Sequence, residues 1–261
     1  MPRRFRLTRR DFARHMTAGG LSFFAGAPLL AQSFTDQGLT APGPGQGVDK
    51  GSLAHWGRLR FRCDNGITDN WSVHPHGDFT LVRAVNAQTS ANLSEVWNVA
   101  DVARLEEMQR FPLLFMHCET APKLTDDEKQ NLREYLLRGG FLYAEDCVNG
   151  NFAHGLPQGN WDFFFQRMHA VLPQLMPEAR FERLPLDHPI FGCYYRLPGG
   201  QPHMQGQRHG GWGLTLKGRL LAYLSPSDAH CGWVSTRWFG RQKSEQAIKM
   251  GTNVYLYAMT H

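Results

Sequence analysis

The chain has 261 residues, of which 42% are hydrophobic and 20% are charged, and this suits one large globular domain or two small ones. Its formal net charge of +5 comes from the first fourteen residues, which contain six arginines and one aspartate. The basic residues between positions 217 and 243 form only a loose cluster, as expected on a solvated surface. Composition therefore argues against a nucleic-acid-binding protein, which needs a concentrated basic patch on the folded domain.

The first 31 residues predict an export signal. A basic segment precedes a moderately apolar stretch at residues 16–31, "MTAGGLSFFAGAPLLA", which is the arrangement of a secretory signal. The stretch is too short and too rich in glycine to span a bilayer comfortably, which takes roughly 20 apolar residues. The run "TRRDF" closely resembles a twin-arginine signal, with Arg9 and Arg10 as the recognised pair.

Export sets the expected compartment and domain boundaries. Cleavage is expected after Ala31, and an uncleaved anchor helix is the alternative. The twin-arginine machinery carries folded proteins, so the mature chain is expected in the periplasm, with no stable transmembrane span after cleavage. Residues 32–56 begin with a segment rich in Gly, Pro and Gln and predict a flexible leader, whereas residues 57–261 predict one folded domain.

The five cysteines would then meet an oxidising compartment. An odd number leaves at least one thiol unpaired, and no two are spaced as C-x-x-C, so a zinc ribbon or thioredoxin motif is absent. The five are Cys63, Cys118, Cys147, Cys193 and Cys231.

A strand, a helix and a second strand follow one another in the middle of the chain. Residues 111–118 are a continuous apolar run, as in a strand buried on both faces. Residues 125–140 predict a helix that begins with a capping box formed by Thr125 and Glu128. Residues 141–146 predict the next strand. Such a crossover is nearly always right-handed and joins parallel strands, so the sheet is predicted to be parallel here.

The other predicted elements flank this unit. The helix at 79–88 is expected to have Asp78 as its cap, and Pro189 is expected to stiffen an extended turn. The remaining predictions are a strand at 57–63, a short helix at 102–108, a helix at 161–172, a strand at 218–225 and a final helix at 245–259.

Several of these segments carry a family resemblance. "LTDDEKQNLREYLLRGGFLYAEDC", "RLPLDHPIF", "GRLLAYLSPSDAHCGW" and "AIKMGTNVYLYAMT" occur in the order seen in the bacterial Domain of Unknown Function family 4159, which the chain resembles over roughly residues 58–261. The resemblance implies an α/β fold, a flavodoxin-like three-layer sandwich with a mainly parallel sheet, similar to the class I glutamine amidotransferase superfamily. The chain is more distantly similar to ThuA-like carbohydrate-associated proteins. The family label implies a fold and the place of a site, but it says nothing about a reaction or a cofactor.

Two strands of the predicted sheet end in polar triplets. His117, Cys118 and Glu119 end the first, and Glu145-Asp146-Cys147 ends the second. Because parallel strands bring their carboxyl ends to one edge, where open α/β folds bind ligands, we expect these side chains to meet in one crevice. Cys118 and Cys147 are expected on adjacent strands, and a disulfide between them requires matching registers.

Cys147 occupies about the place of the amidotransferase nucleophile. That family's turn reads roughly Gly-x-Cys-x-Gly, whereas this chain lacks both glycines around Cys147. Glu145 and Asp146 would also oppose the lowered thiol pKa that a nucleophile needs. A semi-buried thiol at a strand end is therefore the simpler interpretation, and disulfide or metal roles stay open.

The histidines offer candidate bases and ligands. His230 follows the strand at 218–225 and resembles the late catalytic histidine of amidotransferases. His188 can be oriented by Asp187, although a structural turn explains it equally simply. His74 and His76 are weak transition-metal candidates, because a His-Pro-His sequence in a polar loop is more often only a loop.

Two functions remain open from sequence, and the absence of the amidotransferase glycines and of a clear catalytic triad favours the first. The first is an exported binding module that holds a small polar or sugar-like ligand, or a partner, in the crevice, which would be favoured by a groove lined with Trp71, Trp161 and Trp233. The second is a thiol- or metal-dependent hydrolase that uses Cys147 or Asp146 with His230 or His188. The crevice residues common to both are His117, Cys118, Glu119, Glu145 and Trp233.

The twin-arginine assignment predicts that Arg9→Lys combined with Arg10→Lys leaves the precursor inside the cell, because the export machinery recognises the arginine pair. Fractionation of cells that express the full chain measures this, with Arg3→Lys plus Arg4→Lys as the matched control. Normal export of the Arg9/Arg10 variant would refute the assignment.

Overall fold

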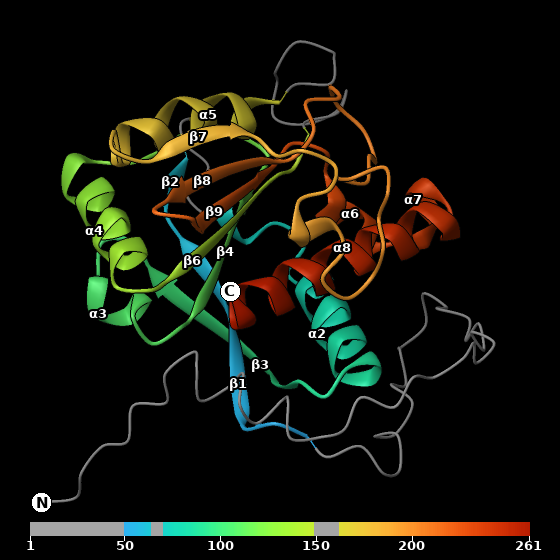
Figure 1. Cartoon of the computed structure of the whole chain (residues 1–261). Coiled ribbons are helices and arrows are strands. Elements are labelled where there is room, and N and C mark those ends of the chain that lie inside the picture. The colour runs from blue at the N-terminus through green and yellow to red at the C-terminus, as the bar shows by residue number, and fades with distance from the viewer. Residues whose placement is uncertain (1–49, 64–69, 149–161) are drawn as a thin grey trace, which may run out of the picture.

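The computed structural model describes residues 50–63, 70–148 and 162–261, and its centre is a seven-stranded sheet (Figure 1). The strand order is β3-β1-β4-β6-β9-β8-β7. The first five strands in this order run parallel, whereas β8 and β7 are antiparallel to their neighbours. The strands are β1 (Leu53–Arg60), β3 (Asn92–Asp101), β4 (Leu113–Cys118), β6 (Phe141–Asp146), β7 (Arg180–Arg183), β8 (Trp212–Leu216) and β9 (Arg219–Ser225). A small antiparallel pair joins β2 (Arg62–Cys63) to β5 (Pro122–Lys123).

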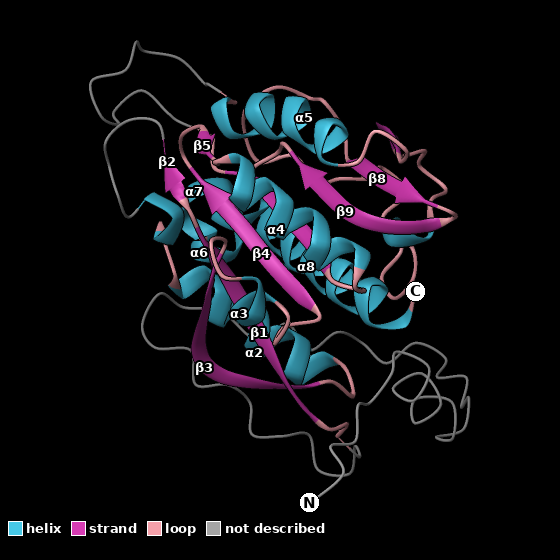
Figure 2. Ribbon diagram, turned by 90° about the vertical axis from the view of Figure 1, so that its left-hand side faces the viewer, coloured by secondary structure: helices cyan, strands magenta, loops and turns pink. Residues whose placement is uncertain are grey.

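Helices cover both faces of the sheet, which gives three layers (Figures 1 and 2). One face packs against α2 (His76–Gln88), α6 (Ala229–Val234) and α8 (Arg241–Thr260), and the other packs against α4 (Asp126–Leu137) and α5 (Phe163–Leu175). The described part of the chain is thus an α/β flavodoxin-like sandwich, and this prediction is confirmed. The remaining short elements are η1 (Asn70–Ser72), α3 (Leu105–Met108), η2 (Pro189–Phe191) and α7 (Thr236–Phe239).

The register of the central strands divides the core into two clusters. Phe115, Tyr143 and Tyr223 are paired across β4, β6 and β9, and all three pack into the cluster under α2 and α8. The residue before each of them packs into the cluster under α4 and α5, because successive side chains alternate between the faces of a sheet. The same alternation determines which face each polar residue at the strand ends will occupy.

The predicted strand–helix–strand unit is present as β4-α4-β6, and Thr125 and Glu128 form the expected capping box. The prediction for Asp78 is wrong. Helix α2 begins at His76 with Pro75 as its N-cap, and the Asp78 side chain turns inward instead of capping. The predicted extended turn is instead the short η2 helix, with the ring of His188 capping it.

Strand β3 was not predicted, and β1 begins at Leu53, earlier than expected. β3 lies at an edge of the sheet and has no regular alternation of buried and exposed residues, so it lacks the usual pattern of a strand.

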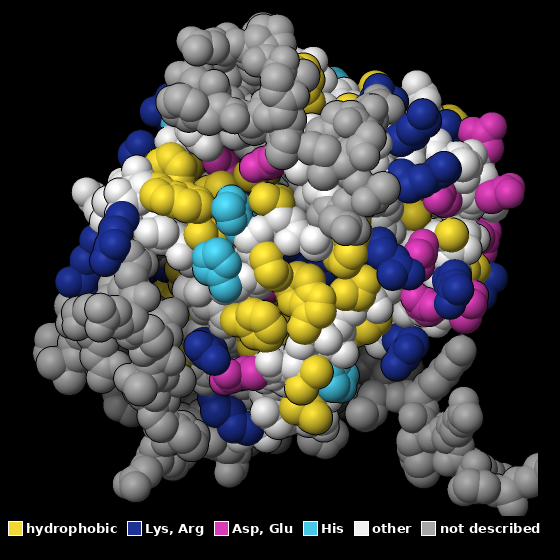
Figure 3. All heavy atoms as spheres, turned by 180° about the vertical axis from the view of Figure 1, so that it is seen from behind, with side chains coloured by type: hydrophobic (Ala, Val, Ile, Leu, Met, Phe, Trp, Pro, Cys, Tyr) yellow, Lys and Arg dark blue, Asp and Glu magenta, His cyan; other side chains and the backbone are white. Residues whose placement is uncertain are grey.

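The predicted export signal and most of the predicted leader, up to residue 49, lie outside the described residues, as does Trp161. Within the described ranges, no helix is both long enough and apolar enough to cross a bilayer. On the described part of the face seen from behind, Lys and Arg side chains lie around the rim and are partly interleaved with acidic ones (Figure 3). That distribution gives no concentrated basic patch on this face, in line with the composition.

Candidate functional site

The register places one set of polar side chains at the carboxyl edge under α2 and α6. His117, Glu145 and Ser225 are paired across β4, β6 and β9, two residues beyond the aromatic row formed by Phe115 and its partners. All three are completely buried. They therefore project toward the start of α6, which follows β9 directly.

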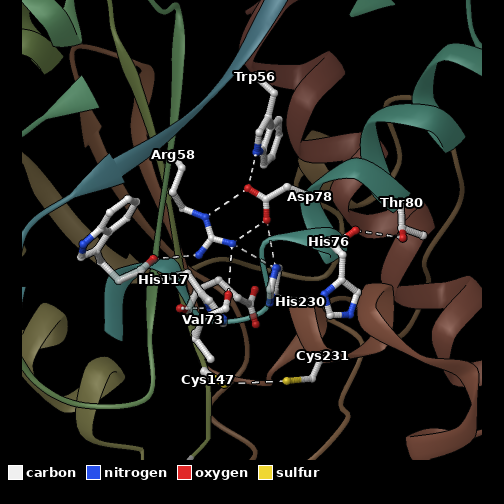
Figure 4. A network of polar contacts seen from close by, with 12 residues as sticks. Trp56, Arg58, Val73, His76, Asp78, Thr80, His117, Cys147, His230 and Cys231 are labelled. Atoms are coloured by element: carbon white, nitrogen blue, oxygen red, sulfur yellow. Dashed lines mark hydrogen bonds and ion pairs between the residues drawn. The ribbon is translucent and has the colours of Figure 1, made fainter. Parts of the chain in front are cut away.

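A buried ion pair lies beside this row (Figure 4). Arg58 of β1 donates from Nε to Asp78 Oδ2 at 3.1 Å and from Nη2 to Asp78 Oδ1 at 2.6 Å. Trp56 Nε1 donates to Asp78 Oδ2 at 3.0 Å, and Arg58 Nη1 donates to the Trp71 carbonyl at 3.0 Å. Asp78 is 1% exposed and Arg58 is 0% exposed, so the two charges share an environment almost free of water.

The pair keeps Asp78 ionised. Burial alone would raise the pKa of this carboxyl, but the charge of Arg58 and the hydrogen bond from His230 outweigh it and lower the pKa from 3.8 to about 2. Because the folded-state pKa lies below the ordinary value, the ionised carboxylate stabilises the fold at neutral pH. That contribution is lost as the pH falls from about 4 toward 2.

Asp78 also orients His230, which lies in α6. The Nε2 atom of His230 is 3.0 Å from Asp78 Oδ1 and 3.2 Å from Arg58 Nη2. We assign the ring proton to Nε2, because the ionised carboxylate accepts it and Arg58 already bonds to both oxygens of Asp78. Burial lowers the pKa of His230 to about 4, so the ring is uncharged at neutral pH. Its Nδ1 atom then carries a lone pair, is buried, and has no hydrogen-bond partner among the described residues.

His117, which lies on β4, is also an uncharged imidazole with one nitrogen hydrogen-bonded and the other without a partner in the described part of the chain. Its Nδ1 is 3.0 Å from the Glu145 carbonyl oxygen, which can only accept, so Nδ1 carries the proton. The Nε2 atom is a buried acceptor without a partner within the described ranges. Burial lowers the pKa of His117 well below its usual range, and its ring centroid lies 4.0 Å from that of His230. Two uncharged imidazoles with unused acceptor nitrogens therefore lie side by side.

The pKa values of two nearby carboxyl groups are shifted in the opposite direction from that of Asp78. Burial raises the pKa of Glu145 to about 8, while its Oε2 accepts from Tyr143 at 3.0 Å and its Oε1 from the Ala229 N–H at 2.6 Å. Burial also raises the pKa of Asp228 to about 7. Carboxyl groups whose pKa values are driven apart within one site are typical of acid–base centres.

The two cysteines expected to lie close together do so, since the Cys147 N–H donates to the Cys118 carbonyl at 3.2 Å, but the register turns their side chains to opposite faces. Cys118 pairs with Asp146, one residue short of Cys147, and a shift of one residue moves a side chain to the opposite face. The Cys118 thiol donates to the Thr120 carbonyl at 2.7 Å, whereas the sulfur of Cys147 lies 3.7 Å from that of Cys231. The strands are adjacent, as expected, and none of the five cysteines, all of which lie within the described residues, forms a disulfide.

Cys147 does not have the environment of a nucleophile. Its hydrogen bond with Cys231, followed by burial, raises the pKa of its thiol well above the usual range, so the thiol is protonated at neutral pH. Asp146 shares the face of Cys118 and accepts from the Phe165 N–H at 3.1 Å. It is therefore on the other side of the sheet from His230.

Two other predicted site residues do not line the crevice. The His188 ring packs against Tyr257, with centroids 5.6 Å apart, and Tyr257 contacts Phe141, the first residue of β6. His188 is thus at the amino end of the sheet, where it lines a pocket of about 650 Å³. Trp233 is 2% exposed and donates to the Ala247 carbonyl, so it forms part of the core below His230 instead of the wall of a groove.

The remaining candidates are Glu119 and His74, which lie in loops, and His76, which is the first residue of α2. Glu119 accepts from Asn70 Nδ2 at 3.3 Å. The rings of His74 and His76 have centroids 6.0 Å apart, and His74 packs against Trp238.

Three residues of the site were not predicted as functional from the sequence: Arg58, Asp78 and Asp228. The sequence did contain an indication for Arg58, because a basic side chain at a core-facing position of an alternating strand needs a buried partner. Asp228 precedes His230 in "SPSDAHC", and its φ of 59° places it in the left-handed region, which non-glycine residues rarely occupy.

Replacing Asp78 with Asn should lower the free energy of unfolding by about 3–5 kcal/mol, because the charge of Arg58 would stay buried without a counter-charge. Urea unfolding at pH 7 measures this, with Asp126→Asn as the control, since that side chain is 98% exposed. Adding Arg58→Met to Asp78→Asn should restore part of the loss. Equal effects of Asp78→Asn and Asp126→Asn would contradict the role of the pair.

A comparison with curated proteins found no match. The sequence profile of the family described as "Domain of unknown function (DUF4159)" matches residues 57–259. This span contains the ion pair, both histidines of the carboxyl edge and both cysteines beside them. The chain belongs to the DUF4159 family.

Proposed function

We propose that the protein is an exported periplasmic hydrolase of small polar substrates, with His230 as its general base. The observation that carries the proposal is the protonation and hydrogen bonding of the His230 ring. Asp78 holds one ring nitrogen, and the other is left as a buried, unused acceptor at the carboxyl edge of the sheet. A general base needs an uncharged imidazole of fixed orientation whose lone pair is free to take a proton.

Each neighbour of His230 has a definite part in this mechanism. Asp78 fixes the tautomer of the ring and stabilises the imidazolium that forms when Nδ1 takes a proton from water. Arg58 keeps Asp78 ionised and in place. His117 Nε2 offers a second acceptor, suited to holding the attacking water or a substrate hydroxyl. The buried setting strengthens these interactions, because little water competes with them.

Cys147 does not support the thiol-dependent form of this hypothesis. Its thiol is protonated and hydrogen-bonded to Cys231, and His230 directs its proton toward Asp78. The proposal therefore uses activated water, with no covalent intermediate on cysteine.

The second candidate is a binding module for a sugar-like ligand. Two adjacent acceptor nitrogens, His117 Nε2 and His230 Nδ1, match a ligand that presents two hydroxyl donors. Trp233 cannot supply a stacking face for such a ligand, because its ring is buried in the core. The similarity to amidotransferases expected from sequence would suit either function, since one fold can serve both.

The proposal predicts that His230→Gln lowers turnover about 10²–10⁴-fold, the usual contribution of a general base. The assay uses the full chain with chromogenic acyl, phosphoryl and glycosyl esters and an anilide. His188→Gln is the matched control and should retain wild-type turnover, because His188 lies at the other end of the sheet.

Turnover that survives in His230→Gln would overturn the proposal. So would a wild-type chain that hydrolyses none of these substrates. If that inactive chain bound sugars saturably by calorimetry, and the binding weakened in His230→Gln, the binding module would be the function instead.

A further inference from the structure

A second group of side chains lies at the same edge and plays no part in the proposed acid–base mechanism. Cys147 is the first residue after β6, Asp228 is the residue before α6, and Cys231 lies in the first turn of α6. β6 and β9 are neighbouring parallel strands, with Glu145 paired to Ser225. Two strand ends and one helix start therefore bring two thiols and a carboxylate together.

The three ligand atoms have the spacing of a metal site. One atom from each side chain lies within 4.8 Å of the other two, and the two sulfurs are 3.7 Å apart. A tetrahedral Zn²⁺ with Zn–S bonds of about 2.3 Å places two sulfurs about 3.8 Å apart. A disulfide would need them about 2.05 Å apart. We propose that Cys147, Cys231 and Asp228 bind one Zn²⁺ ion.

The hydrogen bonding of Asp228 gives a separate reason. Its side chain is completely buried, Gln205 donates to Oδ2 and the Cys231 thiol lies beside the carboxyl group, yet Oδ1 accepts no hydrogen bond of normal geometry from any described residue. A buried carboxylate oxygen without a partner is costly and rare in folded proteins. A cation at this point would satisfy it.

The chemistry of the donors selects the ion. Zn²⁺ would displace the protons of both thiols into solvent, and the two resulting thiolates favour zinc over magnesium or calcium, which prefer sites made only of oxygen ligands. Three protein ligands leave a fourth position for water or a small ligand, as in catalytic zinc sites. Gln205 would act from the outer shell by orienting the Asp228 carboxylate.

This inference uses different residues from the acid–base proposal, and its test measures metal binding instead of turnover. Either can therefore fail while the other holds.

The first experiment measures zinc binding. The full chain is stripped with a chelator under reducing conditions, dialysed, and titrated with Zn²⁺ while bound metal and melting temperature are recorded. We expect one tightly bound equivalent per chain and a melting temperature that rises with zinc, because an ion that binds only the folded state stabilises it. Cys231→Ser and Asp228→Asn should each weaken binding at least tenfold. The matched control Cys118→Ser, a buried thiol on the other face of the sheet, should bind zinc as the wild type does.

The second experiment identifies the ligands by spectroscopy. Co²⁺ in place of zinc should give a thiolate-to-cobalt charge-transfer band, which falls by about half in Cys147→Ser or Cys231→Ser and vanishes when both are replaced. If a variant fails to fold, as judged by circular dichroism, the wild-type titration and cobalt spectrum still decide the proposal.

Three outcomes would overturn the zinc site. They are no stoichiometric zinc in the reduced wild type, undiminished binding in the double Cys→Ser variant, or a Cys147–Cys231 disulfide found by mass spectrometry in protein isolated directly from the periplasm.

Discussion

The ion pair between Arg58 and Asp78 is the constraint on which the candidate site depends. It joins the second strand of the sheet order to the first helix of the covering layer, and both charges are removed from water. A buried pair of this kind is weak evidence for stability, since apolar side chains of the same volume often do as well. The pair instead fixes positions in the site. Asp78 stays ionised and holds His230 Nε2, which leaves Nδ1 as an acceptor without a partner among the described residues.

The two-residue repeat of the strands then separates the polar residues of the edge. His117 and Glu145 project toward His230, whereas Cys118 and Asp146, one position further along, project toward α5. Cys147 returns to the first face and meets Cys231. One edge of the sheet thus carries an imidazole pair and a thiol–carboxylate cluster on one side, and an unrelated set of buried contacts on the other.

Much of the fold could be predicted from sequence, because β4, α4 and β6 have strong local signals: continuous apolar runs and a capping box. The carboxyl edge followed from the parallel crossover. The face that each residue occupies could not be predicted, because it depends on the register between strands, which pairs Cys118 with Asp146 and not with Cys147. Asp78 was predicted as a cap from local sequence, yet its partner Arg58 lies 20 residues away in the chain, and such a contact depends on tertiary packing. β3 was missed for a related reason, since an edge strand need not alternate.

The central claim is that Asp78 holds His230 uncharged, with its proton on Nε2 and a free lone pair on Nδ1. Long-range ¹H–¹⁵N spectra of the histidine rings in the full chain at pH 7 test this directly, with the His230 signals assigned by their loss in His230→Gln. We expect a neutral ring protonated at Nε2 for His230 and a neutral ring protonated at Nδ1 for His117. A doubly protonated His230, or one that carries its proton on Nδ1, would contradict the account.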